Sequence, residues 1–132
     1  MLDCQAMTEE VIQTRAVEYL RLAYPKSKFC ASLGGIRTGF RQAKKAKATG
    51  YVKGFPDLFI YQPVVKDDRV YCGMAIEIQK AQNSYATPEQ KQWIQHLNDV
   101  GYYAVIAKGL PMILDEIDNY LKESEKYKFK TI

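Results

Sequence analysis

The sequence predicts an α/β fold in which helices flank a mixed central sheet. Segments with helical and with strand periodicity alternate along the chain, roughly in the order α, β, (α), β, β, α, β, α. A strand, a helix and another strand follow one another over residues 70–107, which predicts a right-handed βαβ unit with parallel strands. The 132 residues suit a single domain. We expect its core over about residues 8–121 and a charged tail over 122–132.

The first helix is predicted over residues 8–24. Thr8 is a favourable N-cap, and the carboxylates of Glu9 and Glu10 suit the positive end of the helix dipole. Apolar residues then recur at helical spacing until Pro25, which cannot continue the helix.

Three short segments come next. Residues 28–33 are predicted to form a strand, which Gly34 and Gly35 end. Residues 37–49 favour a short basic helix, and residues 50–54 favour a loop.

Residues 57–62 and 70–79 are predicted to be strands. Only the turn at residues 63–69 separates them, so we expect them to pair as an antiparallel hairpin. Along MAIEIQK (residues 74–80), strongly apolar residues alternate with other types, which predicts a half-buried strand. Because side chains alternate between faces, residues 75, 77 and 79 share one face and Lys80 points to the other.

The next helix has the clearest start in the chain. Thr87 is the expected N-cap, Pro88 fits the first helical position, and Gln90 can complete a capping box. We expect this helix to run to about Val100, where Gly101 ends it.

The C-terminal part continues with an apolar strand at residues 102–107, expected to be central and buried, and a last helix at residues 110–121. His96 is expected to be a surface or packed histidine. Four residues of the preceding helix are expected in the core: Trp93, Ile94, Leu97 and Val100.

The composition is that of a soluble globular protein, with 47% hydrophobic and 26% charged residues. We expect no transmembrane helix, because no run of 18 apolar residues occurs, and no signal peptide. The three cysteines (Cys4, Cys30 and Cys72) are widely spaced, which favours a reducing compartment such as the cytoplasm. The single histidine and the absence of a CxxC pair argue against a zinc site, and the absence of GxSxG argues against a serine hydrolase.

Positive charge is concentrated in one window. The formal net charge is +4, but residues 37–53 alone carry +6 and no acid, so the rest of the chain carries −2. Such asymmetry favours a polyanionic partner, with nucleic acid as the first candidate. The alternative is a solvated basic helix or loop. The candidate DNA-binding residues are Arg37, Arg41, Lys44, Lys45, Lys47 and Lys53.

Two carboxylates are expected to converge at one end of the sheet. Asp57 begins one predicted strand directly after Gly54-Phe55-Pro56, and Glu77 lies near the end of the next. Two carboxylates held close together repel each other unless a proton or a cation lies between them. A divalent ion such as Mg²⁺ accepts such oxygen ligands, lowers the pKa of bound water and offsets negative charge that develops on a phosphate.

Four short motifs occur in a fixed order on the predicted elements. They are TEEVIQ (residues 8–13), GFPD (54–57), AIEIQ (75–79) and TPEQKQW (87–93). Together they resemble the virus-type replication-repair nuclease (VRR-Nuc) domain of the PD-(D/E)xK nuclease superfamily. The likeness covers roughly residues 8–109.

The resemblance implies a restriction-endonuclease-like fold and a phosphodiesterase that depends on Mg²⁺ or Mn²⁺. Asp57 and Glu77 would hold the metal, with the carbonyl of Ile78 as a third ligand. Glu9 would approach from the first helix, and Gln90 would lie at the edge of the site. Glu10 is the less well aligned alternative to Glu9, and Gln13 shares the helix face of Glu9.

Position 79 departs from the family pattern, which has a catalytic lysine where this chain has Gln79. Glutamine carries no charge, so the resemblance implies weakened or lost activity. Three explanations are open: a deliberate replacement that gives an inactive form, a natural variant with weak activity, or Lys80 reaching the site through a strand bulge.

Each candidate residue also has an ordinary structural explanation. Asp57 would cap a turn, Glu77 would be a solvated acid, and Glu9 would stabilise only the first helical turn. Gln90 would only complete the capping box, and Gln79 would be a surface amide.

The function predicted from the resemblance is a structure-specific DNA endonuclease. Stand-alone chains of this family resemble phage proteins that act in the bacterial cytoplasm as homodimers and resolve four-way (Holliday) junctions. The alternative is a nucleic-acid-binding module that keeps the fold without the chemistry, and a nuclease acting on RNA is a further possibility.

Overall fold

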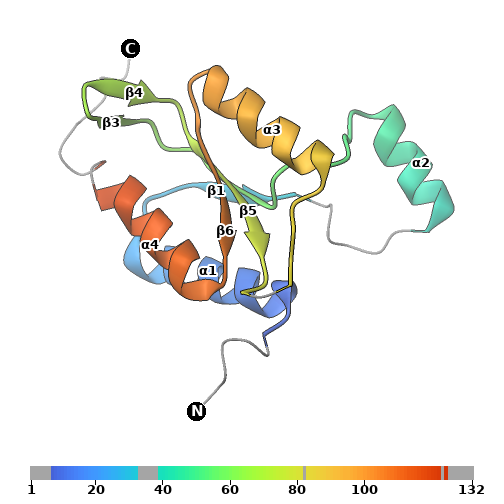
Figure 1. The fold of residues 1–132 in the computed structure, drawn as a ribbon, viewed down its shortest axis with the longest axis horizontal. Coiled ribbons are helices and arrows are strands. Elements are labelled where there is room, and N and C mark those ends of the chain that lie inside the picture. Colours follow the sequence, from blue (N-terminus) through green and yellow to red (C-terminus); the bar gives the residue numbers. More distant parts are fainter. Residues whose placement is uncertain (1–6, 33–38, 82, 123, 125–132) are drawn as a thin grey trace.

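The computed structural model describes residues 7–32, 39–81, 83–122 and 124. Its centre is a mixed four-stranded sheet with helices on both faces, so the predicted α/β architecture is confirmed (Figure 1). The strand order is β1 (Phe29–Ala31), β2 (Leu58–Ile60), β5 (Met74–Gln79) and β6 (Tyr103–Lys108). The β1–β2 and β2–β5 pairs are antiparallel, and the β5–β6 pair is parallel, as the βαβ pattern predicted.

Three helices cover the sheet and one stands apart. Helices α1 (Glu9–Ala23) and α4 (Leu110–Leu121) lie on one face, and α3 (Pro88–Asp99) lies on the other. Helix α2 (Phe40–Ala48) has no buried residue and projects away from the sheet (Figure 1). All four helices occur where the sequence predicts them, within a few residues.

The α1–α4 pair is held by a shared acid as well as by apolar contact. The hydroxyls of Tyr19 and Tyr24 both donate to Oδ1 of Asp118 on α4, over 2.6 and 2.7 Å.

None of the described helices has the length and apolar character to span a bilayer. In the part of the chain that is described, Cys30 and Cys72 are free thiols, and Cys4 lies outside it.

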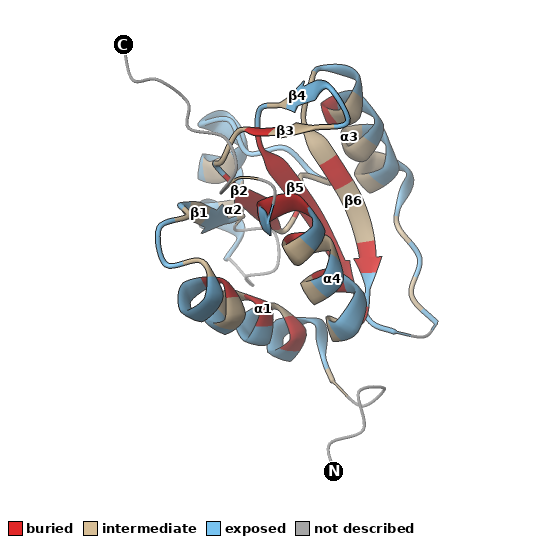
Figure 2. Ribbon diagram, turned by 90° about the vertical axis from the view of Figure 1, so that its left-hand side faces the viewer, coloured by how far each residue is buried: buried red, intermediate tan, exposed pale blue. Residues whose placement is uncertain are grey.

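The core has two halves, one on each side of the sheet. Residues 74, 76 and 78 of β5 pack with α1 and α4, whereas Ala75 packs with Leu97 of α3. The predicted alternation of faces is therefore correct. The predicted half-burial is wrong, because all six residues of β5 are buried between helices on both faces (Figure 2).

The segment between β2 and β5 contains structure that the sequence analysis placed differently. The predicted turn at residues 63–69 includes β3 (Val64–Lys66), and the predicted strand 70–79 is divided into β4 (Arg69–Tyr71) and β5. β3 and β4 pair as a hairpin. Asp67 and Asp68 form its turn with φ of 51° and 61°, the left-handed geometry of a two-residue hairpin loop.

β6 is an edge strand, so its predicted central position is wrong. Helices α3 and α4 cover its two faces, which accounts for its apolar sequence. The side chain of Asn98 at the end of α3 accepts from the N–H of Ala104 and donates to its carbonyl, over 2.9 and 3.0 Å. Of the predicted core residues in α3, Leu97 is buried, Trp93 and Ile94 are half-buried, and Val100 is 51% exposed.

Candidate active site

The register of the antiparallel pair brings Asp57 and Glu77 together. Leu58 pairs with Ile76, so the next position along the ladder places residue 57 opposite residue 77. Asp57 is fixed by the strand it faces, because its Oδ2 accepts a hydrogen bond from the N–H of Ile78 over 2.8 Å. The two carboxyl groups are close enough that each alters the pKa of the other. The predicted convergence of the two acids is therefore present.

The GFP sequence before Asp57 fits closely against α3. Gly54 has a φ of +89°, and a Cβ atom there would lie 2.7 Å from Cβ of Glu89, so no other residue fits without displacement. The ring of Phe55 packs edge-on against Trp93 at a centroid distance of 5.2 Å, and Pro56 is buried. These contacts fix the direction in which the chain enters β2, and with it the Asp57 carboxylate.

Gln90 connects the start of α3 to the acid pair. Its Oε1 accepts from the N–H of Thr87 over 2.8 Å, which completes the predicted capping box. Its Nε2 donates to Oε1 of Glu77 over 2.7 Å. Gln90 therefore completes the cap and also contacts Glu77, and its role at the edge of an active site stays a prediction.

Glu77 is buried, with 3% of its surface exposed, so the alternative of a solvated acid is wrong. Its Oε2 atom has no hydrogen-bond partner among the described residues. Burial raises the pKa of Glu77 to about 9, and the charges of Asp57 and Glu9 contribute to the increase. Burial also raises the pKa of Asp57, against the opposing effect of the Ile78 hydrogen bond.

Glu9 approaches the same region from the first turn of α1. Figure 1 shows the N-terminal end of α1 beside the carboxyl end of β5. Partial burial and the charge of Asp57 raise the pKa of Glu9, and the charge of Lys80 opposes them. Glu9 and Glu10 are both exposed and Gln13 is half-buried, but it is the charge of Glu9 that contributes to the raised pKa of Glu77. Of the two acids in this turn, Glu9 is thus the one that interacts with the pair.

Gln79 is a buried residue with hydrogen bonds to the chain that leads to α3. It is 3% exposed, so the surface-amide alternative is wrong. With the amide oriented to satisfy both of its ends, Nε2 donates to the carbonyl of Ser84 over 3.3 Å and Oε1 accepts from the N–H of Ala86 over 2.8 Å. The contact of Gln79 with Ser84 and Ala86 was not predicted, because no motif in the segment before Thr87 indicates that it packs against β5.

Lys80 does not enter through a strand bulge. The pairing of β5 with β6 continues without a break to Gln79 and Lys108, and Lys80 lies exposed just beyond the strand. The bulge explanation is therefore wrong for this conformation, although the charge of Lys80 acts on Glu9.

The carboxylates present fit a divalent cation. Burial raises the pKa of both acids, the charge of Asp57 raises that of Glu77 further, and the unpartnered Oε2 of Glu77 is a polar atom that a cation would satisfy. No cluster of three His, Cys, Asp or Glu side chains arranged for a metal was found among residues 7–32, 39–81, 83–122 and 124. Asp57 and Glu77 stay the predicted side-chain ligands, and the Ile78 carbonyl stays the predicted third.

The predicted basic surface lies on α2 and on the loop after it. The four basic residues of α2, and Lys53 in the loop, are all exposed. Arg37 lies outside the described residues. Because Gly54 touches Glu89 next to Gln90, this basic segment leads directly to the N-terminal end of α3 and the acid pair. The four residues on α2 are Arg41, Lys44, Lys45 and Lys47.

Comparison with known proteins gives one consistent result. The sequence profile of the VRR-NUC domain family matches residues 6–111. A solved structure described as a VRR_NUC domain protein is 32% identical in sequence, with a TM-score of 0.72. The similarity covers 90% of this chain and 92% of that one. A comparison with curated protein sequences gave no match.

Proposed function

Because the chain belongs to the VRR-NUC domain family, we propose that it is a metal-dependent DNA endonuclease of the PD-(D/E)xK type whose activity is weakened by Gln79. The observation that carries the proposal is the buried Glu77 carboxyl. It lies beside Asp57, one oxygen is held by Gln90, and the other has no partner among the described residues. A buried pair of this kind gains nothing from packing alone.

Asp57 and Glu77 would hold a Mg²⁺ or Mn²⁺ ion, together with the carbonyl of Ile78. When bound, the ion would supply positive charge to the scissile phosphate and make a water molecule easier to deprotonate. The chain's own groups prepare this site. The N–H of Ile78 fixes Asp57, the Gln90 amide fixes Glu77, and Glu9 adds a third negative charge from α1.

Gln79 explains why the activity would be weak. The family pattern has lysine here, and the neutral amide cannot offset negative charge on the phosphate. Removing one donor that stabilises a transition state costs on the order of 10²–10³ in rate. The Gln79 amide also has a hydrogen-bond partner for its nitrogen (Ser84) and one for its oxygen (Ala86). Glutamine thus fits this position whether it is a natural variant or a deliberate replacement.

The test is a cleavage panel with Mn²⁺ on duplex, flap and four-way-junction DNA. It compares the chain with Gln79→Lys and with Gln79→Met, which removes the amide without adding charge. We expect Gln79→Lys to cleave on the order of 10²-fold faster than Gln79→Met. No cleavage of any substrate by any form would refute the nuclease proposal. If the chain cleaves DNA and Gln79→Lys cleaves it no faster, only the proposal that Gln79 weakens the activity is refuted.

A second candidate is a nucleic-acid-binding module without catalysis. The hydrogen bonds of Gln79 favour it, because they give this residue a structural role that needs no reaction. Calorimetry with Mn²⁺ separates the two candidates. A nuclease site should take up the ion in the wild-type chain and lose it in Asp57→Asn, whereas a binding module should show no uptake that depends on Asp57.

The finer features of the proposal come from the family resemblance. They are one nuclease domain per chain, a homodimer, four-way-junction specificity, and a phage origin with action in the bacterial cytoplasm. The same panel tests the substrate, with an RNA duplex included to test DNA against RNA. Sedimentation equilibrium of the chain tests the dimer.

A further inference from the structure

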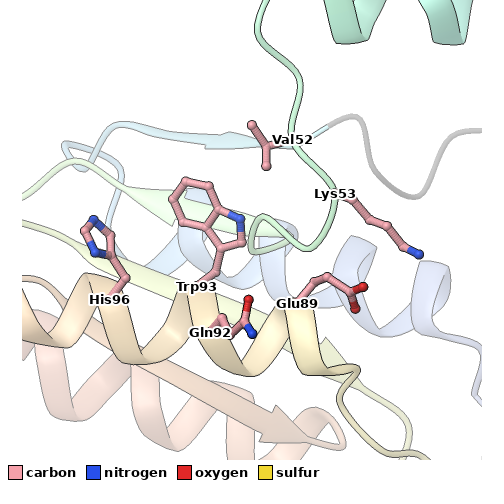
Figure 3. Close-up of a pocket in the computed structure, with 6 residues that line it drawn as sticks. All are labelled: Val52, Lys53, Glu89, Gln92, Trp93 and His96. Carbon is pink, nitrogen blue, oxygen red and sulfur yellow. The ribbon is translucent and has the colours of Figure 1, made fainter.

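A cavity of about 550 Å³ lies on the side of α3 that faces the loop after α2 (Figure 3). It is separate from the acid pair. We call it the Trp93 pocket. Its lining comes from two elements: Val52, Lys53, Glu89, Gln92, Trp93 and His96.

Trp93 gives the pocket an aromatic wall. The side chain is half-buried, and Figure 3 shows it rising from α3 toward the loop that carries Val52. Phe55 and His96 meet the indole at interplanar angles of 81° and 87°, so neither ring stacks on it in parallel. An indole without a parallel partner is a suitable surface for a flat, aromatic ligand.

The polar groups of the pocket favour a nucleobase over a phosphate. Glu89 places a carboxylate in the lining; a backbone hydrogen bond and the charge of Lys53 lower its pKa, so it can accept hydrogen bonds from amino groups on a base edge. Gln92 offers both a donor and an acceptor. Lys53 and the basic helix before it would contact the adjoining backbone.

The pocket lies a short distance along the chain from the proposed active site. Trp93 follows Gln90 by three residues, which is about 4.5 Å along the helix axis. Lys53 precedes Asp57 by four residues, which even fully extended span at most about 14 Å. A strand with its phosphate at the acid pair could therefore place a nearby base in the pocket.

We propose that the Trp93 pocket binds an unpaired nucleobase of the DNA substrate by stacking it on the indole. The inference rests on the proposed nuclease function and deepens it. It implies that the preferred substrate has an unpaired base near the cleavage position, as at a flap, so among the substrates of the cleavage panel it favours the flap over the fully paired duplex and four-way junction.

The test uses Trp93 itself, because it is the only tryptophan in the chain. Its fluorescence is titrated in EDTA, so that the DNA stays intact, with a flap duplex whose unpaired arm carries bases or abasic sites. We expect quenching and about tenfold tighter binding with the bases, since stacking on an aromatic residue is typically worth about 5- to 150-fold per base. Equal quenching by the two DNAs, or none by either, would overturn the inference.

Variants provide a second measurement that does not depend on fluorescence. Trp93→Phe keeps a ring and should retain most of the preference for bases over abasic sites. Trp93→Leu keeps an apolar side chain without a flat face and should lose the preference. Tyr61→Leu, at an exposed aromatic residue at the far end of β2, is the matched control and should bind like the wild type. A full preference in Trp93→Leu would contradict stacking.

Cleavage of the same flap DNA with Mn²⁺ separates this inference from the proposed function. Base-dependent quenching, with no cleavage of any substrate in the panel by the chain or by Gln79→Lys, would support the pocket and refute the nuclease. Cleavage that is equally fast with bases and with abasic sites, together with equal quenching, would support the nuclease and refute the pocket.

Discussion

Replacing Glu77 with glutamine should stabilise the metal-free protein at alkaline pH. Burial holds the pKa of Glu77 near 9 in the folded chain, against 4.5 for an ordinary glutamate. The folded state therefore keeps a proton that the unfolded state has lost. Because the folded pKa is raised, the associated stability is fully present below about pH 4.5 and is lost as the pH rises toward 9. The amide introduced by Glu77→Gln would keep an acceptor for Gln90 without carrying a charge.

The size of the effect follows from the number of protons involved. One extra proton in the folded state gives a slope of about 1.4 kcal/mol per pH unit. Between about pH 5.5 and about pH 8 the wild type should lose about 3 kcal/mol of stability that Glu77→Gln retains. For a chain of 132 residues, Tm of the wild type should therefore fall by about 10 °C more than Tm of Glu77→Gln over this pH range.

The assay is thermal unfolding followed by far-ultraviolet circular dichroism, in EDTA and across this pH range. Parallel curves for the wild type and Glu77→Gln would refute the reasoning, because the carboxyl group would then not be protonated in the folded state. Adding Mn²⁺ at about pH 8 should raise Tm of the wild type and leave that of Glu77→Gln nearly unchanged. An equal increase in both would place the ion elsewhere.

Three further predictions concern the surface, the loop and the edge strand. Replacing Lys44, Lys45 and Lys47 with alanine should reduce the slope of log affinity against log salt by up to about 3 for duplex DNA, and an unchanged slope would place the DNA elsewhere. Gly54→Ala should cost more than about 1 kcal/mol in urea unfolding and lower Mn²⁺ uptake, because a Cβ atom there meets α3 and the backbone has a positive φ. Asn98→Ala should cost about 1–3 kcal/mol in the same unfolding experiment, since two hydrogen bonds to β6 are lost; a wild-type midpoint would contradict this.

Local signals in the sequence predicted the parts of the fold that depend on neighbouring residues. The Thr87 cap with Pro88 and Gln90 placed the start of α3 correctly, because a capping box is formed within four residues. The alternation along β5 correctly assigned residues 75, 77 and 79 to one face. The convergence of the two acids was predicted because Asp57 precedes one strand and Glu77 lies near the end of the antiparallel strand beside it, which places both at the same end of the sheet.

Long-range packing decided what the sequence could not. Alternation along β5 is compatible with one or two covered faces, and only the positions of α1, α3 and α4 decide that both are covered. The apolar sequence of β6 is equally compatible with a central strand and with an edge strand covered by helices. The Asp67-Asp68 turn lies within the predicted turn at residues 63–69, but β3 was missed there, because the positive φ that confines the turn to two residues is one that aspartate tolerates but does not require.

The surroundings of Gln79 change what a lysine at this position would do. Lysine has three donors and no acceptor, so it could replace the hydrogen bond to Ser84 but would leave the N–H of Ala86 without the Gln79 acceptor. That N–H lies one residue before Thr87, which caps α3, and the same helix start carries Gln90 to Glu77. The buried amide of Gln79 and the half-buried amide of Gln90 thus hold the segment before α3 from both ends. A lysine at position 79 would add the charge that the family pattern supplies while loosening the segment that positions Gln90. The rate of Gln79→Lys should therefore rise further when a second substitution holds residues 83–86 in place again. Gln79→Met also lacks the acceptor for the N–H of Ala86 but adds no charge, so it measures the effect of the lost hydrogen bonds by itself.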